Sequence, residues 1–182
     1  MFERFAELYE TSPVADGGGG GMPAAFCRSY GGRSYGDGLL TVFTPEEASY
    51  FVEDVVTAYP GYAGVVTPVC FDWLGDIFVV RKGVGDVLLL ELGTGDALVV
   101  AKTFPEFVDR TLVDEADASL AAGFYETWRA SGGSAPRGLS CVGYKVPLFL
   151  GGKNDVDNLE SSDLDVYWTV IGQVLVRARE GR

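Results

Sequence analysis

The chain has 182 residues, of which 47% are hydrophobic and 13% aromatic, which is enough to bury one substantial core. It carries 26 acidic and 14 basic residues, and its net charge of −12 repels nucleic acid and anionic lipid but attracts a basic partner. No histidine is present, which excludes Ser-His-Asp and Cys-His catalysis and histidine-ligated metals.

The compartment follows from the first residues and the cysteines. The opening MFERFAELYE contains acids and no continuous apolar run, unlike a secretory signal peptide, and the apolar runs further along are too short to cross a bilayer. Cys27, Cys70 and Cys141 are widely separated in apolar surroundings, which is typical of reduced core thiols. We therefore expect a cytoplasmic protein.

The first part of the chain predicts short helices separated by glycine-rich segments. Residues 2–10 place apolar side chains at mostly helical spacing, and residues 23–30 predict a second short helix. The glycine run at residues 17–21 predicts a mobile loop, because glycine loses the most backbone entropy on ordering. Residues 31–38 are turn-rich, and residues 39–43 predict a short strand.

The middle of the chain predicts a capped helix and then a sheet. Thr44, Pro45 and Glu47 form a capping-box pattern, which predicts a helix to about residue 59. Four strands follow, at residues 65–71, 77–82, 86–92 and 97–102. The connections between them are too short for crossover helices, so the strands must form an antiparallel meander.

The C-terminal part predicts helices around one apolar segment. Thr103 opens a helix to about residue 112, and Asp114 caps a longer one. Residues 144–150 predict a buried, strand-like anchor, and Ser162 or Asp163 caps a final helix. The fold class is therefore α+β, an antiparallel meander flanked by helices. We expect an N-terminal helix and loop at residues 1–22 and a single domain at residues 23–182.

Several short motifs resemble catalytic or nucleotide-binding signatures without completing them. Residues 32–36 match G-x-S-x-G, but the chain lacks the histidine that this motif needs. The glycine pairs at residues 83–85 and 93–95 lack the third glycine of a dinucleotide fingerprint, and residues 151–154 lack most of a Walker loop. We interpret these segments as turns and predict no catalytic residue, cofactor or metal ligand.

Acidic residues gather near the C-terminus. Asp155, Asp157 and Glu160, with Asn158 between them, present oxygen atoms but lack the spacing and the central glycine of a calcium loop. An acid–base pair of carboxylates remains an alternative, which would show a cleft with two facing acids of perturbed pKa. A small-ligand module, which would show a deep apolar pocket, and a domain with an unrelated partner are further alternatives.

A family resemblance rests on these residues. The segment CVGYKVPLFLGGK from Cys141, the NLE step at Asn158 and the DVYW that leads from Asp165 to GQVL resemble the C-terminal domain of type VI secretion DNase-immunity proteins. YGDGLL from Tyr35 and FDWLGD from Phe71 resemble the GAD-like segment that precedes this domain, in the SUKH superfamily. The resemblance divides the domain into a GAD-like part, residues 23–100, and an immunity part, residues 101–182, with a SUKH-like fold.

The resemblance implies a non-enzymatic protein that binds and neutralises a cognate toxin, a nuclease, inside the producing cell. A nuclease carries a basic cleft for DNA, so an acidic inhibitor is suited to cover it with fast, salt-sensitive association. We expect the partner-binding surface to consist of acids from the C-terminal segment together with an exposed edge of one of two aromatic residues. The candidate residues are Asp155, Asp157, Asn158, Glu160, Asp163, Asp165, Tyr167 and Trp168.

Overall fold

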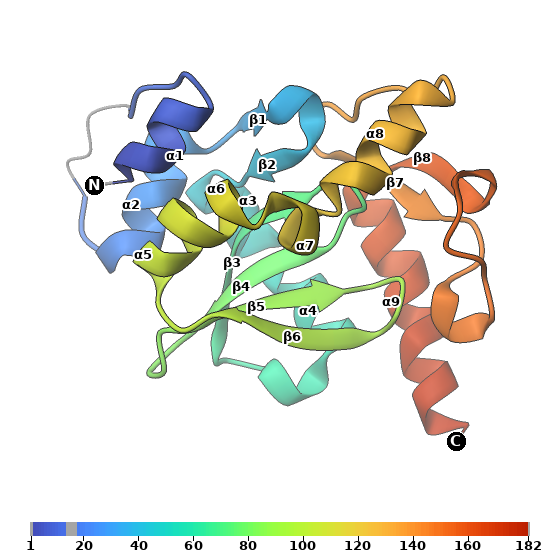
Figure 1. The fold of residues 1–182 in the computed structure, drawn as a ribbon. Coiled ribbons are helices and arrows are strands. Elements are labelled where there is room, and N and C mark those ends of the chain that lie inside the picture. Colours follow the sequence, from blue (N-terminus) through green and yellow to red (C-terminus); the bar gives the residue numbers. More distant parts are fainter. Residues whose placement is uncertain (1, 14–17, 182) are drawn as a thin grey trace.

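A computed structural model of the chain describes residues 2–13 and 18–181 (Figure 1). Of the glycine run that was predicted as a mobile loop, Gly17 lies outside the described residues, and Gly21 is the first residue of a helix. Within the described residues, no helix combines the length and the apolar character that are needed to span a membrane.

The centre of the molecule is a six-stranded antiparallel sheet in which neighbours along the chain are neighbours in space. Its strands are β1 Arg33–Tyr35, β2 Leu40–Val42, β3 Val66–Asp72, β4 Ile77–Arg81, β5 Val87–Glu91 and β6 Asp96–Ala101. The predicted meander is confirmed. The sheet has one strand more at its start, because the glycine turn after Tyr35 lets β1 pair with β2, with Tyr35 opposite Leu40.

Both faces of the sheet are covered, because its central strands are apolar on both sides. On β4, Ile77 and Val79 belong to one buried cluster, whereas Phe78 and Val80 belong to another. This alternation is the period-two geometry of a strand. The molecule therefore has three layers, with helices on either side of the sheet (Figure 1).

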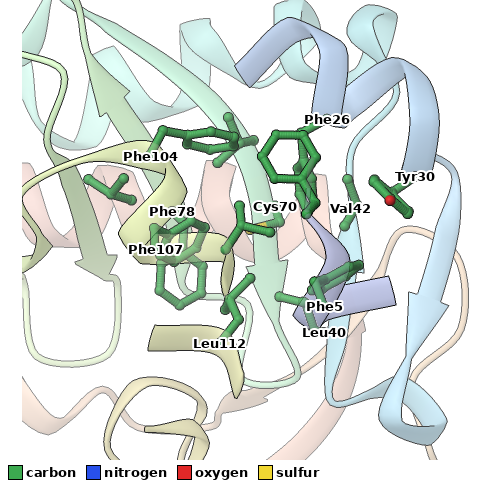
Figure 2. Close-up of a cluster of buried hydrophobic side chains, with 14 of the residues drawn as sticks. Phe5, Phe26, Tyr30, Leu40, Val42, Cys70, Phe78, Phe104, Phe107 and Leu112 are labelled. Carbon is green, nitrogen blue, oxygen red and sulfur yellow. The ribbon is translucent and has the colours of Figure 1, made fainter. Parts of the chain in front are cut away.

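The first helical layer combines the N-terminal helices with the helices that directly follow the sheet in the sequence. It consists of α1 Glu3–Leu8, α2 Gly21–Tyr30, α5 Phe104–Glu106, the π-helical turn η3 Phe107–Thr111, α6 Leu112–Asp114 and α7 Ala116–Leu120. Figure 2 shows its cluster, in which Phe5 of α1 lies among the aromatic rings of Phe26 and Tyr30 at centroid distances of 5.2 and 5.3 Å. The N-terminal helix is thus part of the core.

The second helical layer contains α3 Pro45–Tyr50, α4 Val52–Ala58 and α9 Leu164–Glu180. The predicted capping box is confirmed, because Thr44 Oγ1 accepts the Glu47 N–H at 3.2 Å and Glu47 Oε2 accepts the Thr44 N–H at 2.7 Å. The predicted single helix is instead two helices that meet at Phe51. Phe51 is fully buried, so packing determines the direction of the chain at this point.

The C-terminal hairpin forms a separate two-stranded sheet beside the central one. It consists of β7 Ser140–Tyr144 and β8 Leu159–Asp163, and it packs with α8 Ala122–Ala130 and the β3–β4 turn. Residues 144–150 were expected to be a buried, strand-like segment, but the strand ends at Tyr144. A 3₁₀ turn, η4 Leu148–Leu150, follows with Leu150 exposed. Further 3₁₀ turns are η1 Gly36–Gly38, η2 Pro60–Tyr62 and η5 Val156–Asn158.

The predicted cap at Asp114 is wrong. Its carboxylate pairs instead with the Arg4 guanidinium at 2.6 Å, which ties α1 to the end of α6. The long helix expected after it is divided at Ala121, which has a φ of 48°. Asp163 does precede the last helix, although its side chain makes no capping hydrogen bond.

Candidate functional site

Two buried carboxylates lie in the β3–β4 turn. Asp72 Oδ1 accepts the N–H groups of Leu74 at 2.9 Å and Asp76 at 3.0 Å, and Asp76 Oδ1 accepts the Leu92 N–H at 2.9 Å. Burial raises the pKa of both carboxyl groups, and so does the negative charge of neighbouring carboxylates. Asp72 therefore holds the turn in shape, whereas Asp76 connects the turn to Leu92, the residue after β5.

The same turn is a junction for the C-terminal elements. Trp73 Nε1 donates to Leu120 O at 3.0 Å, and the Val142 N–H of β7 donates to Trp73 O at 2.7 Å. Trp168 Nε1 of α9 donates to Gly75 O at 2.7 Å. One short turn therefore fixes α7, β7 and α9 relative to the sheet.

The two predicted aromatic site residues are buried. Trp168 is 1% exposed and Tyr167 is 5% exposed. The Tyr167 hydroxyl accepts the Tyr144 N–H at 3.3 Å, and its ring packs directly on Gly143 of β7. The expectation of an exposed aromatic edge is therefore wrong, because these rings hold α9 against the hairpin and the turn.

Four of the five predicted acids line two surface cavities. Asp155, Asp157 and Asn158 line the first, which has a volume of about 360 Å³ and is formed mainly by the loop between β7 and β8. Asn158 closes this loop, because its amide bonds the Val146 N–H at 3.0 Å and Val146 O at 2.8 Å. Asp155 Oδ1 accepts the Asn158 N–H at 3.2 Å. This part of the predicted site is a hydrogen-bonded loop.

Asp163 and Asp165 line the second cavity, a groove with a volume of about 570 Å³. Its other lining residues are Glu46, Glu47, Tyr50, Phe51 and Leu139. Glu160 is exposed on β8, where it is paired with Gly143. The structure thus places two of the predicted acids in a loop, one on β8 and two at a groove, and it adds residues of α3 to the groove.

Ion pairs among the described residues do not balance the negative charge at the groove. Within residues 2–13 and 18–181, none of Glu46, Glu47, Asp163 and Asp165 forms an ion pair. Several arginines among the described residues pair instead with acids outside the groove, as Arg129 and Arg137 do with Asp37. A surplus of unpaired negative charge therefore lies around the groove.

Asp54 of α4 extends this negative region along α9. Thr169 Oγ1 donates to Asp54 Oδ1 at 3.3 Å, which places the carboxyl between the two helices. Burial raises the pKa of Asp54, and the carboxylates of Asp165 and Glu53 raise it further. Negative side chains therefore repel one another on this side of the molecule.

The cysteines and short motifs have structural roles. Cys27, Cys70 and Cys141 are buried free thiols, as predicted, and burial raises the pKa of each. Ser34, the serine of the G-x-S-x-G match, pairs its hydroxyl with that of Thr41 at 2.8 Å across β1 and β2. Among the described residues, no group of three or more cysteine, aspartate or glutamate side chains is arranged to hold a metal.

Sequence reasoning missed Glu46, Tyr50 and Leu139 as members of a site. Glu46 and Glu47 were explained by the helix start, and residues 131–138, just before Leu139, are rich in glycine, serine and proline. Tyr50 was the one available signal, because a large aromatic side chain off the apolar stripe of a short helix is expected to be exposed. Its side chain is 61% exposed.

Comparisons with known proteins found one similar fold and one matching protein family. The chain adopts the fold of the crystal structure of Atu4351 from Agrobacterium tumefaciens, with a TM-score of 0.67, 14% identity and coverage of 95% of this chain and 89% of that one. No curated protein matches the chain. Residues 101–175 match the family described as T6SS immunity protein Tdi1, C-terminal.

The matched region begins at the last residue of β6 and ends within α9. It contains β7, β8 and both groups of predicted acids, so the resemblance to type VI secretion immunity proteins is confirmed for this region. The SUKH and GAD-like assignments remain predictions. Residues 101–175 of the chain are therefore similar to the C-terminal domain of the T6SS immunity protein Tdi1.

Proposed function

We propose that this protein is a cytoplasmic, non-enzymatic immunity protein that binds a cognate toxin, a nuclease, and neutralises it through an acidic surface. The family match supports the class of protein, since it covers β7, β8 and most of α9. The single observation that supports the mode of action is the set of unpaired carboxylates at the C-terminal part of the molecule.

The mechanism follows from electrostatics. A nuclease binds DNA phosphates with basic side chains, so its substrate cleft attracts a negatively charged protein. This chain has a net charge of −12, and complementary charge accelerates encounter and favours the correct orientation. An acidic inhibitor seated over the cleft blocks DNA entry without any chemical step.

The acids that we assign to this surface are exposed or partly exposed. They are Asp155, Asp157, Glu160, Asp163 and Asp165. Asn158, which is not acidic, belongs to the same surface because it lies in the loop with Asp155 and Asp157. Tyr167 and Trp168, which belonged to the sequence prediction, are left out because both rings are buried. They support the surface by fixing α9.

The test starts from the gene next to that of this protein. Its product, made with and without this chain, is expected to stop bacterial growth and degrade cellular DNA only when this chain is absent. A pull-down of the two purified proteins is expected to succeed at low salt and weaken at high salt, because the association is electrostatic. Growth arrest that this chain does not relieve, and no binding at low salt, would contradict the proposal.

Charge reversal locates the surface. We expect the triple variant Asp155→Lys, Asp157→Lys and Glu160→Lys to bind the toxin more weakly and with a smaller dependence on salt. The matched control reverses three exposed glutamates outside this surface, Glu7, Glu126 and Glu180, and it should retain most of the affinity. Equal losses in both triple variants would show that net charge alone matters and would exclude this placement.

A further inference from the structure

An apolar groove opens between α3, the segment before β7 and the start of α9. The Leu164 N–H donates to Leu139 O at 3.0 Å, which holds the start of α9 beside that segment. Phe51 and Leu164 belong to one buried cluster, so α3 and α9 stand on the same face of the sheet (Figure 1). The groove is therefore supported by packed elements on both sides.

The groove exposes apolar side chains that nothing in the described chain covers. Tyr50 is 61% exposed and Leu139 is 38% exposed, whereas Phe51, beside Tyr50, is fully buried. The Tyr50 ring meets the Phe51 ring edge to face at a centroid distance of 5.3 Å, which supports it from one side. Exposed aromatic side chains that a rigid core supports are typical anchors of protein interfaces.

The rim of the groove has one sign of charge. Glu46 and Glu47 come from α3, Asp163 and Asp165 come from the start of α9, and no lysine or arginine lines the groove. An anionic ligand such as nucleic acid is repelled by this rim. A lone cation leaves Tyr50 and Leu139 exposed, so the complementary occupant carries both positive charge and apolar surface.

We infer that this groove is the anchor point for the toxin, which inserts a short segment in which lysine or arginine flanks an apolar side chain. The inference rests on the proposed immunity function and sharpens it, because it adds an apolar anchor at α3 and α9 to the acidic surface proposed above. The volume of about 570 Å³ is in the range of pockets that hold a few side chains. The aliphatic stems of lysine and arginine pack on Tyr50 while their charges reach the rim.

A first experiment needs no toxin. The chain, labelled with ¹⁵N, is titrated with the capped tetrapeptide Leu-Arg-Leu-Lys, and Leu-Glu-Leu-Glu serves as the control ligand. The basic peptide is expected to shift amide signals of residues that line the groove, in a saturable and salt-sensitive way, and Glu46→Lys should abolish the shifts. Shifts at the loop of residues 155–158 instead, or no saturable shifts, would overturn the inference.

A second experiment uses the toxin and the double variant Glu46→Lys with Tyr50→Ser. Both side chains are exposed, so the variant should fold, which its circular dichroism and melting temperature would verify. We expect it to bind at least about tenfold more weakly, because it loses an aromatic anchor and reverses a rim charge. Glu126→Lys on α8 makes the same charge change outside the groove and should alter affinity by less than about twofold.

The outcomes separate the two proposals. If the wild-type chain binds no toxin while the basic peptide still occupies the groove, the immunity function is contradicted and the groove remains a site for basic segments. If the wild-type chain binds the toxin and the double variant binds it equally well, the groove is excluded and the immunity function stands.

Discussion

Single side chains in the β3–β4 turn connect the sheet to the rest of the molecule. Trp73 reaches α7, and Gly75 receives the indole N–H of Trp168 from α9. Gly75 has a φ of 85°, and a Cβ at this position would lie 3.0 Å from Cys141 Sγ. The FDWLGD segment therefore combines a glycine that cannot be replaced without strain with two buried acids.

Asp76 makes stability depend on pH. Burial and the neighbouring Glu91 carboxylate raise its pKa from 3.8 to about 8 in the folded protein. Because the folded state holds this proton more tightly than the unfolded chain, the stabilising contribution is complete below about pH 4 and is lost as the pH rises through 8. Asp76→Asn keeps an acceptor oxygen for the Leu92 N–H but has no proton to lose.

We therefore expect the unfolding free energy of Asp76→Asn, relative to wild type, to increase between about pH 5 and pH 8. Urea denaturation at the two pH values measures this difference. Asp86→Asn is the control. The hydrogen bond from Arg81 lowers the pKa of Asp86, so the stability that the Asp86 carboxylate contributes is lost only in acid. The difference in unfolding free energy between Asp86→Asn and wild type should therefore stay constant between about pH 5 and pH 8. A constant difference for Asp76→Asn as well would contradict the ionisation argument.

At the scale of elements, the close contact between the β7–β8 hairpin and α9 explains part of the family signature. Gly143 of CVGY lies under the ring of Tyr167 from DVYW, and a Cβ added to Gly143 would lie 2.3 Å from Tyr167 Cε2. The Tyr167 ring has little freedom to move, because it is buried and its hydroxyl accepts the Tyr144 N–H. These signature residues pack on one another.

Replacing Gly143 by alanine is expected to destabilise the protein by about 1–3 kcal/mol, the usual cost of overpacking a core. Chemical denaturation followed by tryptophan fluorescence measures the change. Gly61→Ala is the matched control, because no atom lies within 4 Å of the added Cβ and the backbone is not left-handed there. Equal stability of the two variants would show that the hairpin moves away from α9 at little cost.

At the scale of the whole molecule, the region that matches the family does not contain a complete core. Phe104 and Phe107 pack on Phe78 of the sheet, whereas Trp168 and Leu175 cover the opposite face. Residues 101–175 thus supply helices to both faces of a sheet that precedes them in the sequence. The predicted boundary after residue 100 lies at the end of β6. The helices on its C-terminal side pack on both faces of the sheet on its N-terminal side.

We expect a fragment of residues 101–182 to lack a stable tertiary structure. Its helices lose the sheet on which they pack, and the remaining β7–β8 pair is only two strands, which is marginal in water. Thermal unfolding followed by circular dichroism should show no cooperative transition for the fragment and a sharp one for the full chain. A cooperative transition in the fragment would mean that the matched region folds independently.

The sequence by itself determined the local elements of this protein. The capping box at Thr44 and the cap at Thr103 form as predicted, because a cap depends on residues three positions apart. The meander of β3 to β6 and the buried thiols also follow from local patterns, since period-two apolar runs with short turns have few other ways to fold. The family motif in residues 101–175 indicated the immunity class, which implies a toxin as partner.

Only the tertiary structure decided where those elements meet. The groove takes residues from α3, from the segment before β7 and from the start of α9, and no local pattern links Tyr50 to Asp165. Packing also buried Tyr167 and Trp168, split the helices at Phe51 and Ala121, and paired Asp114 with Arg4 instead of a helix end. Such contacts depend on how side chains fill space between distant segments, which propensity and periodicity do not encode.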